Sequence, residues 1–98
     1  MTYWMKVHHN PEGKLVAACD TEVLGEVYTE GKMRLEVDAA FYQDKEVEFV
    51  QLLEEMEAAT TTNFVGEHLI TELVESDLVQ EDEVEHVDGV PHVQMFFI

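Results

Sequence analysis

Leu15-Val16-Ala17-Ala18-Cys19 is an apolar run with no polar side chain on either face of an extended chain. A short run of this kind is typical of a β-strand that is buried on both sides. The turn Asn10-Pro11-Glu12-Gly13 precedes it, with a proline that sets φ and a glycine that supplies a positive φ. Residues 3–8 before that turn alternate between two faces. The sequence therefore predicts a β-hairpin whose second strand is central in a sheet.

Two amphipathic helices are predicted in the middle of the chain. Asp44 is a suitable N-cap for the first, in which apolar residues recur at helical spacing from Phe49 to Ala59. The second runs from Val65 to Glu75, with an outer face of Glu67, His68, Thr71, Glu72 and Glu75. Thr60-Thr61-Thr62-Asn63 between them favours a break or a kink.

Strands are predicted on both sides of these helices. One spans Met33–Asp38, with Met33, Leu35 and Val37 facing inwards, and a short helical turn capped by Asp20 precedes it. Strands at 84–87 and 93–98 flank Asp88-Gly89, a strong hairpin signal. The order ββ(α)β–αα–ββ predicts one α+β domain over residues 1–98. We expect a two-layer sandwich of a mostly antiparallel sheet with two helices on one face.

Positive charge is confined to the first 45 residues. The chain has 22 acidic and 5 basic residues, a net charge of −17, and no Lys or Arg from Glu46 onwards. Such a surface repels phosphate and anionic lipid, which argues against nucleic-acid binding by the C-terminal half and against a membrane partner. The acidity is interpreted either as adaptation to a salty cytoplasm or as a docking surface for a basic partner, centred on 81–88.

Two further features of the sequence indicate the cellular compartment. A single cysteine, Cys19, excludes a disulfide within the chain, as suits a reducing interior. No secretory signal and no apolar run of about 18–20 residues is present. We expect a cytoplasmic protein.

Several short motifs resemble those of an archaeal family, domain-of-unknown-function family 424. In the first half these motifs are Cys19-Asp20, Leu24-Gly25, Gly31, Arg34-Leu35-Glu36-Val37 and Phe41-Tyr42. In the second half they are Asn63, Val65-Gly66-Glu67, Leu78-Val79 and Gly89-Val90-Pro91-His92. The resemblance implies an archaeal cytoplasmic protein with a small α+β fold, and it implies no activity.

This chain departs from the family pattern in two places. Asp77 stands near the end of the second helix, where the family often has glycine. Aspartate also adopts the left-handed conformation, so the helix end is expected to persist. The C-terminal half lacks the few Lys and Arg residues typical of the family, which argues further against nucleic-acid binding and favours the high-salt interpretation.

Cys19, Asp20 and His92 are the candidate catalytic residues. A thiolate beside an imidazole, with a carboxylate to orient it, is the arrangement of nucleophilic catalysis. The structural interpretation is favoured, because Cys19 ends a buried strand and Asp20 is a suitable helix cap. Acidic surroundings also raise the pKa of a thiol.

Other candidates concern binding. His8, His9, His86 and His92 offer imidazoles without the spacing of a zinc motif, so neither a metal nor another cofactor is expected. Arg34, the only arginine, suits either a bound anion or an ion pair with Glu36 or Asp38. The aromatic residues Trp4, Tyr28, Phe41 and Tyr42 suit either base stacking or the core.

The first functional hypothesis is a small non-enzymatic interaction module linked to RNA or to the translation machinery, with a basic protein or an RNA-associated partner. Its contact surface combines residues 1–45 with Arg34 and the turn residues Gly89, Pro91 and His92. The alternative is a small enzyme or metal-assisted hydrolase that uses Cys19, Asp20 and His92. The protein is expected to be a monomer or a homodimer, because a terminal strand at 95–98 invites pairing of its edge.

Overall fold

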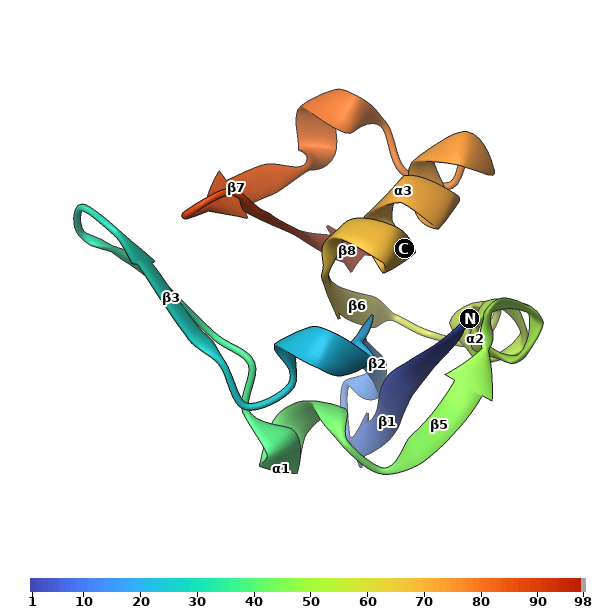
Figure 1. Ribbon diagram of the computed structural model, residues 1–98. Helices are drawn as coiled ribbons and strands as arrows, with labels where there is room; N and C mark the ends of the chain where they lie inside the picture. The colour runs from blue at the N-terminus through green and yellow to red at the C-terminus, as the bar shows by residue number, and fades with distance from the viewer. Residues whose placement is uncertain (98) are drawn as a thin grey trace.

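A six-stranded sheet forms the centre of the protein (Figure 1). The computed structural model describes residues 1–97 and has the strand order β5-β1-β2-β6-β8-β7. Neighbouring strands are antiparallel except β2 and β6, which are parallel. The strands are β1 (Thr2–Asn10), β2 (Gly13–Asp20), β5 (Lys45–Glu48), β6 (Thr61–Val65), β7 (Glu85–Val87) and β8 (Val90–Phe96). The predicted α+β class with a mostly antiparallel sheet is confirmed.

The predicted hairpin and its central strand are also confirmed. β1 pairs with β2 from Tyr3 opposite Asp20 to Asn10 opposite Gly13. β2 has a paired strand on each side, and residues 16–20 are buried. Both faces of β2 are covered, which explains why its sequence lacks the alternation of a half-exposed strand.

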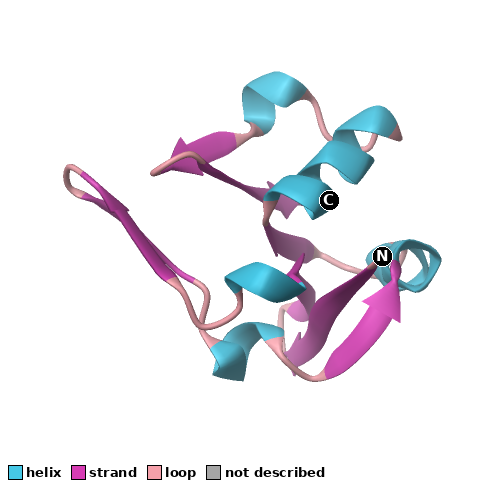
Figure 2. Cartoon of the chain, viewed as in Figure 1, coloured by secondary structure: helices cyan, strands magenta, loops and turns pink. Residues whose placement is uncertain are grey.

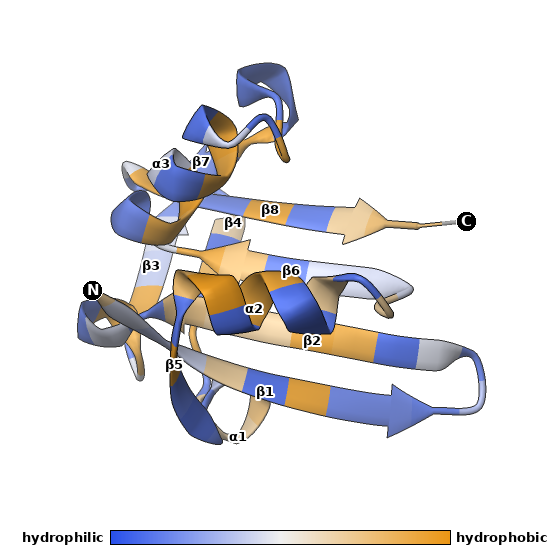
Figure 3. Cartoon of the chain, turned by 90° about the vertical axis from the view of Figure 1, so that its right-hand side faces the viewer, coloured by the Kyte–Doolittle hydropathy of each residue, from blue (hydrophilic) through white to orange (hydrophobic). Residues whose placement is uncertain are grey.

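Two helices cover one face of the sheet. They are α2 (Phe49–Met56) and α3 (Glu67–Glu75). Leu52 of α2 and Leu69 and Leu73 of α3 are fully buried against Tyr3 and Phe64 of the sheet. Figure 3 shows α2 lying across the central strands, with hydrophobic and hydrophilic residues alternating at helical spacing.

Shorter elements cover the other face. They are η1 (Thr21–Val23), α1 (Ala39–Tyr42) and a separate hairpin of β3 (Val27–Glu30) and β4 (Met33–Glu36). This hairpin, here called the β3–β4 arm, projects from the body of the protein (Figure 2). Tyr28 and Leu35 pair across the arm and pack against the core on this face. The Asp88 N–H donates a hydrogen bond to the Glu30 carboxylate at 2.7 Å, which ties the arm to the turn between β7 and β8.

Three strands were not expected from the sequence: β3, which pairs with β4 in the arm, and β5 and β6 in the main sheet. Thr61–Val65 forms β6 rather than a break between helices, because β2 and β8 supply hydrogen-bonding partners on both sides. Lys45–Glu48 forms β5 beside β1, so the first helix begins at Phe49 rather than just after Asp44. The Glu48 N–H donates to the Gln51 side-chain oxygen at 2.8 Å, which closes the start of this helix.

Several predicted boundaries also change. The strand expected at 33–38 ends at Glu36, and Met33 is 47% exposed rather than inward-facing because it lies at the tip of the arm. The last strand begins at Val90, and its predicted end at Ile98 lies outside the described residues. The predictions of a turn at Asp88-Gly89 and of a helix end at Asp77 are confirmed. Asp88 and Gly89 both have positive φ in a two-residue hairpin, and Asp77 has φ 60° just beyond the end of α3.

η2 (Glu81–Glu83) lies between α3 and β7. None of the helices in residues 1–97 has the length and apolar character needed to cross a bilayer.

Candidate functional site

The three candidate catalytic residues lie apart. Cys19 and Asp20 are consecutive on β2, so their side chains point to opposite faces of the sheet. His92 is in register with Cys19 through Val65, but two strands away, which is about 10 Å at the usual strand spacing. A nucleophile and its base need hydrogen-bond reach, about 3 Å. The structure therefore does not bring the three side chains together.

Cys19 is a core residue. Its side chain is fully buried on the face covered by the β3–β4 arm, beside Val37 and Val65. Burial, and to a smaller extent the negative charge of Asp20, together raise the pKa of the Cys19 thiol to about 12. At neutral pH the residue is a protonated thiol with no access to solvent.

Asp20 caps α3 from a distant part of the chain. Its two carboxylate oxygens accept hydrogen bonds from the backbone N–H groups of His68 and Leu69, each at 2.9 Å. The sequence predicted instead that Asp20 caps the turn that follows it, but no such side-chain bond forms at η1. Burial raises the pKa of Asp20, and the two backbone hydrogen bonds oppose that rise. The cap is 2% exposed and replaces the side chain that the N-cap residue, Gly66, lacks.

Gly66 makes room for this cap. It has φ 122°, and a Cβ at this position would lie 2.4 Å from Cγ of Asp20. Its N–H donates to the carbonyl of Pro91 at 3.0 Å, which attaches the start of α3 to β8. Only glycine adopts this backbone angle without strain and also leaves space for the carboxylate.

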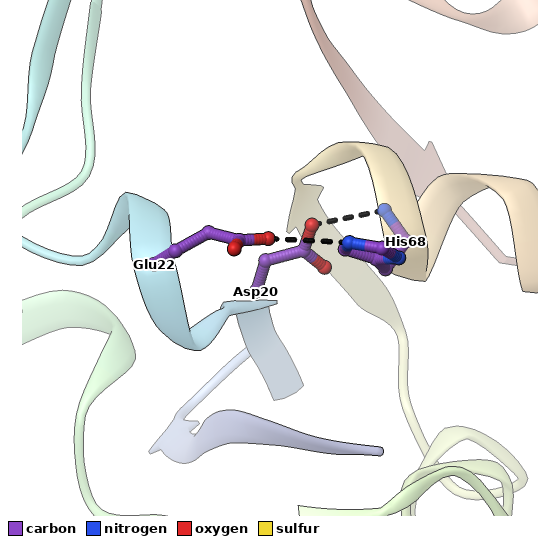
Figure 4. A group of neighbouring side chains, drawn as sticks. All are labelled: Asp20, Glu22 and His68. Carbon is purple, nitrogen blue, oxygen red and sulfur yellow. Dashed lines mark hydrogen bonds and ion pairs between the residues drawn. The ribbon is translucent and has the colours of Figure 1, made fainter.

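Glu22 and His68 complete a cluster around Asp20 (Figure 4). Nε2 of His68 lies 3.4 Å from Oε1 of Glu22, and the three side chains offer ligand atoms within 4.8 Å of one another. Two carboxylates and one imidazole are a ligand set that transition metals accept. However, Asp20 already binds two backbone N–H groups, and the positive end of the α3 dipole opposes a cation there. These contacts favour a structural role for the cluster.

The sequence missed Glu22 and His68 as neighbours of Asp20. His68 was correctly placed on the outer face of its helix, but nothing local shows which distant residue meets that face. The predicted imidazole set does not form. Within residues 1–97, no group of three or more potential metal ligands includes His8, His9, His86 or His92.

The predicted binding residues differ in accessibility. Arg34 is exposed on the arm and lies 3.7 Å from the Glu36 carboxylate, the ion pair considered from the sequence. Gly89 is exposed in its turn, whereas Pro91 is buried. His92 is half-buried, with Nε2 3.9 Å from the Glu85 carboxylate.

α3 forms a ridge with an open cleft on each side. We call the outward-facing residues Glu67, His68, Thr71, Glu72 and Glu75 the α3 ridge. The first cleft, of about 670 Å³, separates α3 from the start of α2 and is lined by Met1, Tyr3, Glu48, Phe49, Val50, Glu67, His68, Thr71 and Glu72. The second, of about 470 Å³, separates α3 from β7 and is lined by Glu67, Ile70, Thr71, Val74, Glu75, Glu81, Val84, His86 and Pro91. Along the described chain, no Lys or Arg lines either cleft.

The sequence matches the family described as "Protein of unknown function (DUF424)" over residues 7–98. The chain belongs to the DUF424 family. The crystal structure of an uncharacterized conserved protein from Methanopyrus kandleri is similar, with a TM-score of 0.75 and 28% sequence identity. The similarity covers 98% of this chain and 91% of that chain. No curated protein matches this chain.

In this DUF424 protein, motifs from three separate segments meet at the start of α3. Asp20 comes from the Cys19-Asp20 motif, Gly66 from the motif at 65–67 and Pro91 from the motif at 89–92, and hydrogen bonds or close packing connect them. These positions are explained by the need to hold α3 on the sheet. The exposed residues of the α3 ridge and the β3–β4 arm are not needed for that attachment and are among those free to contact another molecule.

Proposed function

We propose that this protein is a small non-enzymatic interaction module that binds a basic protein through the α3 ridge. The observation that carries the proposal is the lining of the two clefts beside α3. Each combines carboxylates with apolar side chains, and in the described chain neither contains a Lys or Arg. Such a surface suits a partner that presents Lys or Arg side chains next to an apolar residue.

The basic residues support this assignment by their positions. Lys14 forms an ion pair with Glu55 at 2.6 Å, and the ammonium group of Lys6 donates to the carbonyl of Ala40 at 2.9 Å. Arg34 and Lys32 lie on the β3–β4 arm, on the opposite side of the sheet from α3. The field around α3 is therefore negative, which attracts a basic surface and repels nucleic-acid phosphates.

The partner class follows from this charge. Proteins that bind RNA present basic surfaces, so a ribosomal or other RNA-associated protein fits the α3 ridge better than RNA itself. The alternative, an enzyme built on Cys19, Asp20 and His92, requires a proximity that these residues lack in the structure. The β3–β4 arm carries Lys32 and Arg34 and is less acidic than the ridge, so it repels phosphates less.

The test is binding of a short synthetic peptide of alternating lysine and leucine, followed by fluorescence anisotropy near physiological ionic strength. The ridge variant Glu67→Gln/Glu75→Gln removes two charges beside α3. The matched control Glu54→Gln/Glu57→Gln removes two exposed charges from α2 and its C-terminal end. The ridge variant is expected to weaken binding about fivefold, and the control less than about twofold.

Equal weakening by both variants would show that the peptide responds only to overall charge, and the proposal would then be wrong. Circular dichroism of both variants establishes that the fold is retained. Titration with a single-stranded RNA oligonucleotide in the same buffer is expected to give no binding at the ridge. RNA binding that the ridge variant strengthens but the control does not would agree with this expectation.

A further inference from the structure

The outer edge of β8 is open over half of its length. β7 pairs only with Val90, Pro91 and His92, and its last residue pair joins Glu85 to His92. Beyond that pair, β8 continues to Phe96 with β6 on its inner side only. Figure 3 shows β8 running along the border of the sheet well past β7.

The hydrogen bonds on the inner side show which backbone groups of β8 point outwards. Pro91 accepts a hydrogen bond on the β6 side, and the Phe97 N–H donates one on the same side. In an antiparallel ladder, residues that bond to one neighbour alternate along the strand, so the odd-numbered residues of β8 bond towards β6. The N–H and C=O groups of Gln94 and Phe96 therefore point to the outer edge, where no strand of the described chain reaches them.

This open edge lacks the protection that edge strands normally carry. Exposed edges are usually blocked by charged side chains, and the opposite edge strand, β5, has Lys45, Glu46 and Glu48. Residues 89–98 form the longest stretch of the chain without a charged residue. Phe96 is 72% exposed and Phe97 is 42% exposed at this edge. An apolar, uncharged edge is exceptional in a chain with a net charge of −17.

We propose that a second copy of this chain pairs with the open edge, β8 against β8 in antiparallel orientation. The register follows from the free backbone groups. Gln94 of each copy pairs with Phe96 of the other, which makes four hydrogen bonds, and Met95 faces its counterpart across the two-fold axis. In this register Phe97 of the second copy lies opposite Val93. The next residue of the first copy, His92, is already paired with Glu85, so β7 and the second copy occupy successive parts of one edge.

The strand that pairs with this edge is inferred to come from a second copy because the paired residues are uncharged. A self-paired edge brings no carboxylate directly against another, because no residue between 93 and 97 is charged. Glu83 and Glu85 border the small cleft beside His92 and Gln94, and the two copies together carry a large negative charge. Repulsion is therefore long-range and is screened by salt, since the Debye length falls from about 10 Å at 0.1 M to about 3 Å at 1 M. The dimer is expected to strengthen as salt rises.

The experiment is sedimentation velocity over a range of protein concentrations in about 0.1 M and about 1 M KCl. The wild-type chain is expected to approach twice its 11.3 kDa mass, at lower protein concentration in the higher salt. Gln94→Pro removes an outward N–H that the monomer does not use, and edge strands tolerate proline there. Each dimer then loses two of its four hydrogen bonds, which raises the dissociation constant roughly 25-fold at about fivefold a bond. Gln94→Ala keeps the N–H and is the matched control, with dimerisation expected to be unchanged within about twofold.

A wild-type chain that remains monomeric at all concentrations in about 1 M KCl would overturn the proposal. Dimerisation of Gln94→Pro with the wild-type constant would also overturn it. Circular dichroism checks that Gln94→Pro is folded. If it is not, Phe96→Glu provides the second variant, because it places a carboxylate of each copy beside the two-fold axis while changing an exposed side chain. This test is independent of the α3 ridge, which lies on a different surface.

Discussion

Replacing Gly66 with alanine tests how α3 is held on the sheet. Gly66 immediately precedes α3 and has φ 122°, in a region that side chains strongly disfavour. The new methyl group would lie 2.4 Å from Cγ and 2.6 Å from Oδ2 of Asp20. Because Asp20 is buried between the sheet and α3, it is unable to move without leaving the helix N–H groups of His68 and Leu69.

The expected loss of stability has two parts. Forcing alanine into this backbone conformation costs about 1–3 kcal/mol. Displacing Asp20 weakens two hydrogen bonds to a charged acceptor, each with a net contribution of about 1.5–3 kcal/mol, although water recovers part of that loss. We expect Gly66→Ala to lower the free energy of unfolding by about 3–5 kcal/mol, out of the roughly 5–15 kcal/mol of a typical domain.

The assay is urea denaturation followed by circular dichroism, in high salt to reduce charge repulsion. Gly25→Ala is the matched control, since Gly25 also has a positive φ, 85°, but no atom lies within 4 Å of its Cβ position. The control reports backbone strain without a collision and is expected to cost about 1 kcal/mol. Equal losses in the two variants would refute the role assigned to the contact between Gly66 and Asp20.

Two further predictions concern buried groups. Burial raises the pKa of Cys19 from 9.0 to about 12, so the Cys19 contribution to stability is present below pH 9 and is lost as the pH rises from about 9 to 12. The urea concentration at the midpoint of unfolding should fall over that pH range. The fall should be less steep in the Cys19→Ala variant. Rapid alkylation of the native thiol at pH 8 would contradict this account. Tyr3 donates a hydrogen bond from its buried hydroxyl to the Glu72 carboxylate, so Tyr3→Phe is expected to cost about 1–2 kcal/mol in the same assay. Tyr28→Phe, at a half-buried hydroxyl, is the control and should cost less than about 0.5 kcal/mol; the reverse order would show that the Tyr3 bond contributes nothing.

Patterns that depend on neighbouring residues were predictable from the sequence. The apolar run at 15–19 indicated a central buried strand, and Asp88-Gly89 indicated a two-residue hairpin. The outer face of α3 was also predicted correctly, because exposure repeats with the period of the helix. Each of these predictions rests on a pattern that lies within a few residues along the chain.

Thr61–Val65 and Lys45–Glu48 show where local patterns stop being informative. Their sequences are polar and favour a break or a helix start, yet both become strands because a neighbouring strand is present to pair with them. Hydrogen bonds to such a neighbour satisfy the backbone, which outweighs a weak local preference.

The sequence by itself determined the α+β class, the central hairpin and the uneven charge of this DUF424 protein. Only the tertiary structure decided that Asp20 caps a helix 48 residues away and that Cys19 and His92 lie on different strands, two apart. It also decided that β7 leaves half of β8 uncovered. The physical reason is that caps, clefts and open edges arise between segments that meet only when the core forms. Local periodicity records which side of a segment is buried but not which distant segment buries it.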